Sequence, residues 1–151
     1  MRSVLTMCVC LVLGMAVIPA APINEGYEGM INKLFDAISE GKGSEGLDAL
    51  YRSNPYSDKI QDAVQQVKSS YGSIEGLVGK YRGSTLILKR DVGDRLVYLY
   101  YLVAYDREPM KFEFLFYRPG DKWVIQNFSF SDKITDDVRD FAKYGLLERQ
   151  K

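Results

Sequence analysis

Four apolar and aromatic runs in the second half of the chain, separated by short turn sequences, constrain the fold more than any other feature. The runs are Ser84–Arg90, Arg95–Tyr105, Met110–Tyr117 and Trp123–Phe130. The segments between them, 91–94, 106–109 and 118–122, are rich in Asp, Gly and Pro, which is typical of turns. Because such short connections join neighbouring strands that run in opposite directions, the sequence predicts an antiparallel meander.

The first half of the chain predicts helices, because its apolar residues recur at helical spacing. A first helix is expected from Ile23 to Ile38, with Gly41 and Gly43 ending it. Ser44 and Ser57 are expected to cap a second and a third helix, since serine favours this position. The apolar residues of these two helices are Leu47, Leu50, Tyr51, Ile60, Ala63, Val64, Val67 and Tyr71.

Two further segments complete the expected order of elements. Four glycines predict a turn-rich connection that leads into the first strand: Gly72, Gly76, Gly79 and Gly83. A closing helix is expected to begin at Thr135 and to end at Gly145. Its apolar stripe is Ile134, Val138 and Phe141.

Helices followed by a meander predict an α+β fold in which the leading helices cover one face of the sheet. In this order of elements the chain resembles the nuclear-transport-factor-2-like (cystatin-like) superfamily. Two sequence patterns resemble small exported members of that superfamily: Phe116-Tyr117-Arg118-Pro119 leading to Trp123, and Phe128-Ser129-Phe130. The resemblance covers most of residues 23–130. It implies a cone of helices wrapped by a curved sheet, often with a pocket between them, and sheet-to-sheet dimers. It does not imply one activity, because this fold hosts enzymes, binders and assembly modules.

The first twenty residues predict an export signal. Arg2 precedes an apolar run from Val4 to Ile18, and Pro19-Ala20-Ala21 follows, a pattern typical of secretory signals. We expect cleavage after Ala20, leaving residues 21–151 as a single domain in the periplasm or outside the cell. A lipoprotein acylated at Cys8 or Cys10 and a buried apolar helix are the alternatives.

Composition excludes several classes of chemistry. The chain has no histidine, and its two cysteines, Cys8 and Cys10, lie in the expected signal, so Ser-His and Cys-His catalysis are excluded in the exported protein. No cofactor and no metal site are expected. With 20 basic and 20 acidic residues, neither nucleic acid nor a membrane surface is an expected partner, and no stable membrane insertion is expected after signal removal.

Strand alternation predicts which side chains meet the helices. If 118–122 is a five-residue loop, Tyr117 lies opposite Trp123 and Phe114 opposite Gln126. Phe112, Phe114 and Phe116 then face the helices, and Gln126 is the one polar residue among them. Gln126 either bonds a polar neighbour or lines a ligand pocket with Phe114. Tyr101 and Tyr105 join this face if the 106–109 loop has four residues; Tyr98 and Tyr100 replace them if it has three.

The opposite face is expected to be half apolar and half polar. Its candidate contact residues are Tyr98, Tyr100, Leu115, Tyr117, Trp123 and Ile125. Because monomers rarely expose a large aromatic patch, we expect it to be covered by a second copy, by residues 134–143, or by a foreign protein. A homodimer through the sheet is the favoured interpretation.

These features predict a non-catalytic exported module that binds a small apolar ligand or a protein. One alternative is a cofactor-free isomerase or cyclase that uses a pocket carboxylate, Asp36 or Glu113, and a tyrosine. A second alternative is an envelope assembly or inhibitory protein that acts through the outer aromatic face of the sheet. An inward-pointing Asp36 or Glu113 would distinguish the enzyme from the binding module.

Overall fold

The computed structural model describes residues 26–148, and its architecture is α+β, as the order of elements predicts. Helical segments come first: α1 (Tyr27–Ser39), α2 (Gly43–Tyr51), the 3₁₀ helix η1 (Ser57–Ile60) and α3 (Gln61–Val78). The strands β1 (Tyr81–Val92), β2 (Leu96–Tyr105), β3 (Met110–Tyr117) and β4 (Val124–Ser131) follow, and then α4 (Thr135–Glu148). The expected export signal, including Cys8, Cys10 and the cleavage point after Ala20, lies outside the described residues.

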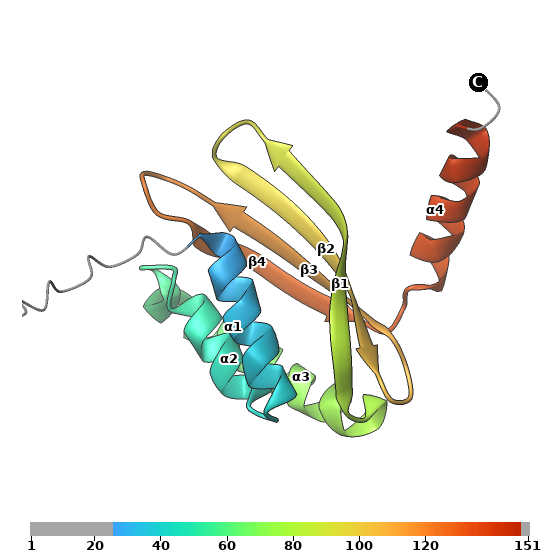
Figure 1. Cartoon of the computed structure of the whole chain (residues 1–151). Helices are drawn as coiled ribbons and strands as arrows, with labels where there is room; N and C mark the ends of the chain where they lie inside the picture. Colours follow the sequence, from blue (N-terminus) through green and yellow to red (C-terminus); the bar gives the residue numbers. More distant parts are fainter. Residues whose placement is uncertain (1–25, 149–151) are drawn as a thin grey trace, which may run out of the picture.

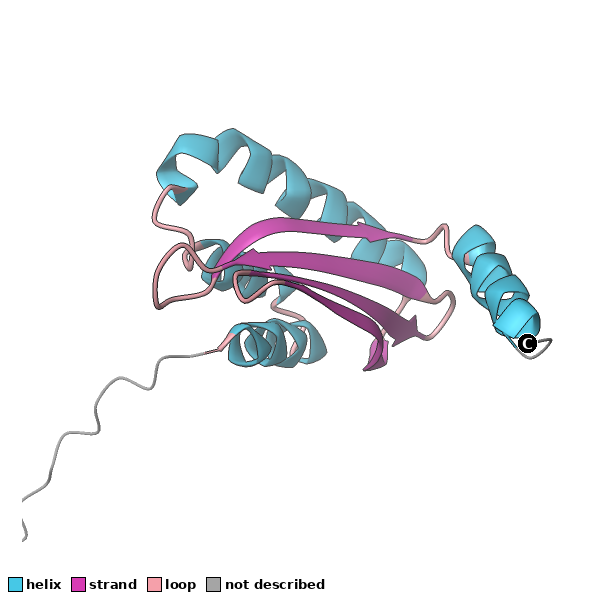
Figure 2. Ribbon diagram, turned by 90° about the horizontal axis from the view of Figure 1, so that it is seen from above, coloured by secondary structure: helices cyan, strands magenta, loops and turns pink. Residues whose placement is uncertain are grey.

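The four strands form one antiparallel sheet in the order β1-β2-β3-β4, so the predicted meander is confirmed. Figure 1 shows the sheet as strongly twisted, with α1, α2 and α3 together and α4 standing apart from them. The view from above places α4 beyond the end of the strands (Figure 2). We call the face of the sheet that packs on α1–α3 the inner face, and the opposite one the outer face.

The inner face and the leading helices share a core built around aromatic rings. Phe112, Phe114 and Phe116 are fully buried, as the strand alternation predicts. The ring of Phe35 on α1 lies 6.0 Å from that of Phe112 and 6.3 Å from that of Phe114, measured between centroids. Burying such a side chain stabilises the fold by roughly 2–3 kcal/mol, so these phenylalanines fix the sheet against the helices.

α3 runs further than the sequence predicts, because it continues through Gly72 and Gly76 to Val78. A glycine inside a helix costs only about 1 kcal/mol relative to alanine, and this helix buries Val64, Tyr71 and Val78. The chain turns instead at Gly79, whose φ of 89° suits glycine. The end predicted for α4 at Gly145 is also wrong, since that helix extends to Glu148.

The predicted register of β3 and β4 is wrong at the turn. Tyr117 pairs with Val124 rather than Trp123, and a bulge then leaves Gln126 without a partner on β3. The one-residue shift at the turn reverses the faces to which the first side chains of β4 point. The bulge adds one residue to β4 and reverses them again. The side chains of Phe128 and Phe130 therefore still point inward, although Phe114 pairs with Phe128.

Candidate functional site on the outer sheet face

The middle of the outer face combines charged residues and tyrosines from two adjacent strands. Lys111 and Glu113 alternate along β3 with the buried phenylalanines, so their side chains point away from the helices. Glu113 pairs with Tyr100 on β2, and Leu115 pairs with Tyr98. We call Tyr98, Tyr100, Lys111, Glu113, Ser129 and Asp137 the outer cluster.

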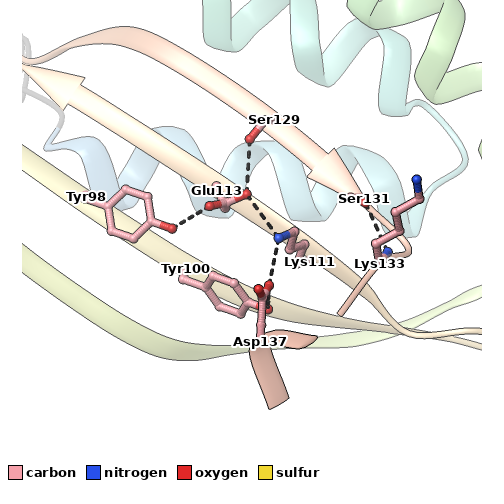
Figure 3. Close-up of polar contacts among 8 residues, drawn as sticks. All are labelled: Tyr98, Tyr100, Lys111, Glu113, Ser129, Ser131, Lys133 and Asp137. Carbon is pink, nitrogen blue, oxygen red and sulfur yellow. Dashed lines mark hydrogen bonds and ion pairs between the residues drawn. The ribbon is translucent and has the colours of Figure 1, made fainter. Parts of the chain in front are cut away.

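Glu113 organises one half of the outer cluster (Figure 3). The Tyr98 hydroxyl donates to Glu113 Oε1 at 2.6 Å, and the Ser129 hydroxyl donates to Oε2 at 3.4 Å. Lys111 Nζ lies 3.9 Å from the same Oε2. A single carboxylate thus ties together β2, β3 and β4, which holds these side chains in one arrangement.

Asp137, in the first turn of α4, organises the other half. Lys111 Nζ donates to Asp137 Oδ2 at 2.7 Å, and the Tyr100 hydroxyl donates to the same oxygen at 3.1 Å. The rings of Tyr100 and Phe141 also meet edge to face, 5.9 Å apart between centroids. Just before α4, the Ser131 hydroxyl accepts the backbone N–H of Lys133 at 3.0 Å (Figure 3). Hydrogen bonds and an ion pair therefore attach the start of α4 to the sheet.

The shifted pKa values in the outer cluster keep its tyrosines and its lysine protonated, and its aspartate ionised, at neutral pH. Burial, with the bond to Asp137, raises the pKa of Tyr100 to about 12, and burial with the bond to Glu113 raises the pKa of Tyr98. The bond to Asp137 raises the pKa of Lys111, and the bond to Lys111 lowers the pKa of Asp137. A general acid or base works best with a pKa near the operating pH, and the pKa values of these four groups are shifted away from neutral pH.

The two ends of the outer face differ in how they are covered. At the α4 end, Tyr100 is 6% exposed. At the other end, Tyr117 is 38% and Val92 is 60% exposed. On α4 itself, Val138 and Phe141 are 55% and 45% exposed, although they belong to its apolar stripe. The outer face thus has a closed end and an open apolar end.

Four of the six predicted contact residues lie on the outer face: Tyr98, Tyr100, Leu115 and Tyr117. Trp123 and Ile125 do not, because of the slip at the β3–β4 turn. Trp123 packs against the ring of Tyr27 on α1, 5.1 Å away between centroids. Ile125 is 1% exposed in the core, and its backbone bonds the side chains of Ser53 and Asn54.

The predicted pocket residues do not come together around a space. Gln126 is exposed in the bulge of β4, so its predicted place among the phenylalanines is wrong. Phe114 is fully buried, and its ring lies between 5.0 and 6.3 Å from its neighbours, measured between centroids. Those neighbouring rings are Phe35, Tyr101, Phe116 and Phe128.

Tyr101 and Tyr105 lie on the inner face, which is the face that a four-residue 106–109 loop predicts, although Met110 pairs with Val103 rather than with Tyr105. Tyr101 packs on Phe35 at 5.3 Å between ring centroids. The Tyr105 hydroxyl meets the Tyr71 hydroxyl at 3.2 Å, and burial raises the pKa of Tyr105 to about 12. Both tyrosines therefore serve the packing of α1 and α3 on the sheet.

The two candidate catalytic carboxylates do not enter the core. Asp36 is exposed on α1, and Glu113 belongs to the outer cluster. Among the residues whose side chains the structure describes, no buried residue is polar or charged apart from tyrosine, and no group of acidic side chains could hold a metal ion. Within residues 26–148, no helix combines the length and the apolar character that crossing a membrane requires.

Asp137 is a contact residue that the sequence pattern does not single out. Its place near the start of a helix predicts only a favourable interaction with the helix dipole. The contact with Lys111 depends on how the 132–134 segment turns α4 toward β3, and no spacing in the sequence encodes that. Ser53 and Asn54 hydrogen-bond the backbone of Ile125 across 72 and 71 positions of the sequence. Local patterns do not predict contacts of this kind either.

Comparison of the chain with protein-family models, with curated proteins and with solved structures gives no match.

Proposed function

We propose that this protein is an exported, non-catalytic binding module whose outer sheet face associates with a second copy of the chain. The observation that carries the proposal is the outer face itself: a fully paired polar cluster beside an apolar end that α4 leaves open. An arrangement of this kind provides a rigid surface for contact, because its side chains are already held in place before a partner arrives.

A second copy suits this face because the face carries both signs of charge. Lys111 and Arg90 are basic, Glu113 and Asp137 are acidic, and all four lie on the outer side of the sheet or against it. Lys111 and Glu113 are two residues apart on one strand, so a two-fold axis between them sets Lys111 over Glu113 of the partner subunit. Opposite charges then meet in both halves of the dimer.

The uneven covering of the outer face favours the same partner. A two-fold axis through its middle places the closed end of one copy over the open end of the other. The exposed Val138 and Phe141 of each α4 then lie toward Val92 and Tyr117 of the partner subunit. Apolar side chains left exposed on the isolated chain become buried, which is the main favourable contribution to association.

A non-catalytic role is supported by the placement of the carboxylates. The enzyme alternative needs an acid near a tyrosine in a pocket, whereas Asp36 is exposed and Glu113 is held by Tyr98 and Ser129. The small apolar ligand that the resemblance implies would need room beside Phe114, which is enclosed by aromatic rings. The protein-binding version of the proposal is therefore the one we favour.

Sedimentation velocity at micromolar concentration tests the association. The unmodified chain is expected to sediment as a dimer, and Leu115→Lys as a monomer, because a lysine on this face would have to be buried in the interface without a charged partner. Leu77→Lys is the matched control, since Leu77 is 70% exposed on α3 and away from the outer face. Tyr117→Asp is a second disrupting change at the open end. A chain that is monomeric at all concentrations would exclude the dimer.

An envelope assembly or inhibitory protein is the second candidate, and it would use the same face for a foreign partner. A monomer that captures an envelope protein, with capture lost in Leu115→Lys and kept in Leu77→Lys, would favour this candidate over self-association.

We also propose that residues 21–151 form a nuclear-transport-factor-2-like cone and that the chain reaches the periplasm or the cell exterior. The helix-first order and the meander over α1–α3 support the fold assignment. The basic and apolar start of the sequence supports export. N-terminal sequencing of protein recovered outside the cytoplasm is expected to begin at Ala21, and an intact Met1 would contradict the export assignment.

A further inference from the structure

A cleft between the leading helices lies on another part of the molecule from the outer sheet face. It encloses about 310 Å³ and is formed by the end of α2, by η1 and by the first turns of α3. Its lining residues are Asp48, Tyr51, Arg52, Ser57, Asp58, Gln61, Val64 and Gln65. A volume at the lower end of the range for ligand sites suits a molecule of about the size of a dipeptide.

Arg52 is the basic residue among those that line the cleft. Arg52 follows Asp48 by four residues, a spacing at which an acidic and a basic side chain on a helix usually attract each other. Asp48 bonds Lys68 of α3 instead, with Nζ 2.8 Å from Oδ2. Within the described part of the chain Arg52 makes no ion pair, so its guanidinium can accept a carboxylate in the two-point manner that arginine favours.

Acidic groups and an apolar floor complete the cleft. Asp58 accepts a long hydrogen bond from Gln61, whose amide nitrogen lies 3.5 Å from Oδ1. The carboxylate of Asp58 can therefore accept hydrogen bonds from an ammonium group. Val64 and Tyr51, each 8% exposed, form the apolar part of the lining.

We propose that this cleft binds a small zwitterion of dipeptide size, with its carboxylate on Arg52 and its ammonium group on Asp58. The apolar floor takes the side chain. A ligand with one charge alone would leave a charged group of the cleft without its partner, so recognition requires both termini to be free.

Titration of the isotope-labelled full chain with L-alanyl-L-phenylalanine, followed by NMR, tests the proposal. Signals of Tyr51, Val64 and Gln65 are expected to shift, with a dissociation constant at or below the millimolar range. The N-acetylated and the C-amidated forms of the dipeptide are each expected to bind about tenfold more weakly, because each lacks one charge. Free L-phenylalanine, in which the two charges lie closer together, is expected to bind more weakly than the dipeptide, and equal binding would contradict the proposed size of the ligand.

Two variants test which residue of the cleft binds each charged group of the dipeptide. Arg52→Gln is expected to abolish the preference for the free carboxylate, and Asp58→Asn the preference for the free amine. Arg82→Gln on β1 is the matched control and is expected to leave both preferences unchanged, and thermal unfolding confirms that each variant folds. The proposal is overturned if the dipeptide shifts none of the cleft signals up to about 10 mM, or if the blocked forms bind as well as the free one.

Discussion

The inner and outer faces of the same four strands are both rich in aromatic rings, but they hold those rings in different ways. On the inner face, Phe112, Phe114 and Phe116 are fully buried and contact other rings. On the outer face, Tyr98 and Tyr100 lie on the sheet and direct their hydroxyls to Glu113 and Asp137. The comparison shows how one strand can close a core on one side and present a prepared polar surface on the other.

The largest expected effect separates two neighbours on β3. Phe114→Ala removes a fully buried ring and is expected to lower the free energy of unfolding by about 3–5 kcal/mol. Leu115→Ala, one residue further along on the outer face, is expected to cost about 1 kcal/mol, because its side chain is only partly buried in one copy of the chain. Urea unfolding at a concentration that keeps the protein monomeric measures both. Equal losses would contradict the difference between the faces.

A second prediction concerns how tightly the helices pack beneath the inner face. A Cβ added at Gly43 would overlap Cε1 of Tyr71, whose ring packs against Phe112 and Phe130. Gly43→Ala is therefore expected to destabilise the fold by about 1–3 kcal/mol. Gly72→Ala is expected to stabilise it by up to about 1 kcal/mol, because a Cβ there meets nothing within 4 Å and alanine favours the helix. Thermal unfolding of the two variants should shift in opposite directions.

The smallest expected effect concerns the ion pair between Lys111 and Asp137, which attaches α4 to the sheet. The folded-state pKa of Asp137 is lowered, so its contribution is complete above its unfolded pKa of about 3.9 and is lost as pH falls through the folded value. The pKa of Lys111 is raised, so its contribution is complete below about 10.4 and is lost at still higher pH. The Lys111–Asp137 pair should therefore act between about pH 4 and pH 10.

Lys111→Met is expected to weaken the attachment of α4 by about 0.5–1 kcal/mol, since the pair is partly exposed. Hydrogen exchange of the first turn of α4 measures this change, and the difference from the unmodified chain should shrink as the pH falls below about 4. Arg139→Met, which removes an exposed pair with Asp136, is the control and should have no measurable effect. An effect of Lys111→Met that is independent of pH would contradict the assigned contact.

Sequence periodicity predicts the inner face well because burial repeats every second residue along β3. The outward positions of Leu115 and Tyr117 follow from the same alternation, whereas those of Tyr98 and Tyr100 also depend on the connection between β2 and β3. Trp123, Ile125 and Gln126 could not be placed, because a longer turn and a bulge each change the register by one residue and leave no signal in composition. Contacts between distant segments, such as Lys111 with Asp137, depend on tertiary geometry that local patterns do not contain.

The most direct test of the two-face account is the rate at which an introduced thiol reacts with a maleimide at several protein concentrations. The background carries Cys8→Ser and Cys10→Ser, so that Leu115→Cys on the outer face or Leu99→Cys on the inner face supplies the one thiol. The Leu115→Cys thiol is expected to react readily in dilute solution and to become protected as the concentration rises into the micromolar range. The Leu99→Cys thiol, at a position 1% exposed, is expected to stay protected throughout. Reaction of the Leu115→Cys thiol at one rate over the whole concentration range would contradict the account.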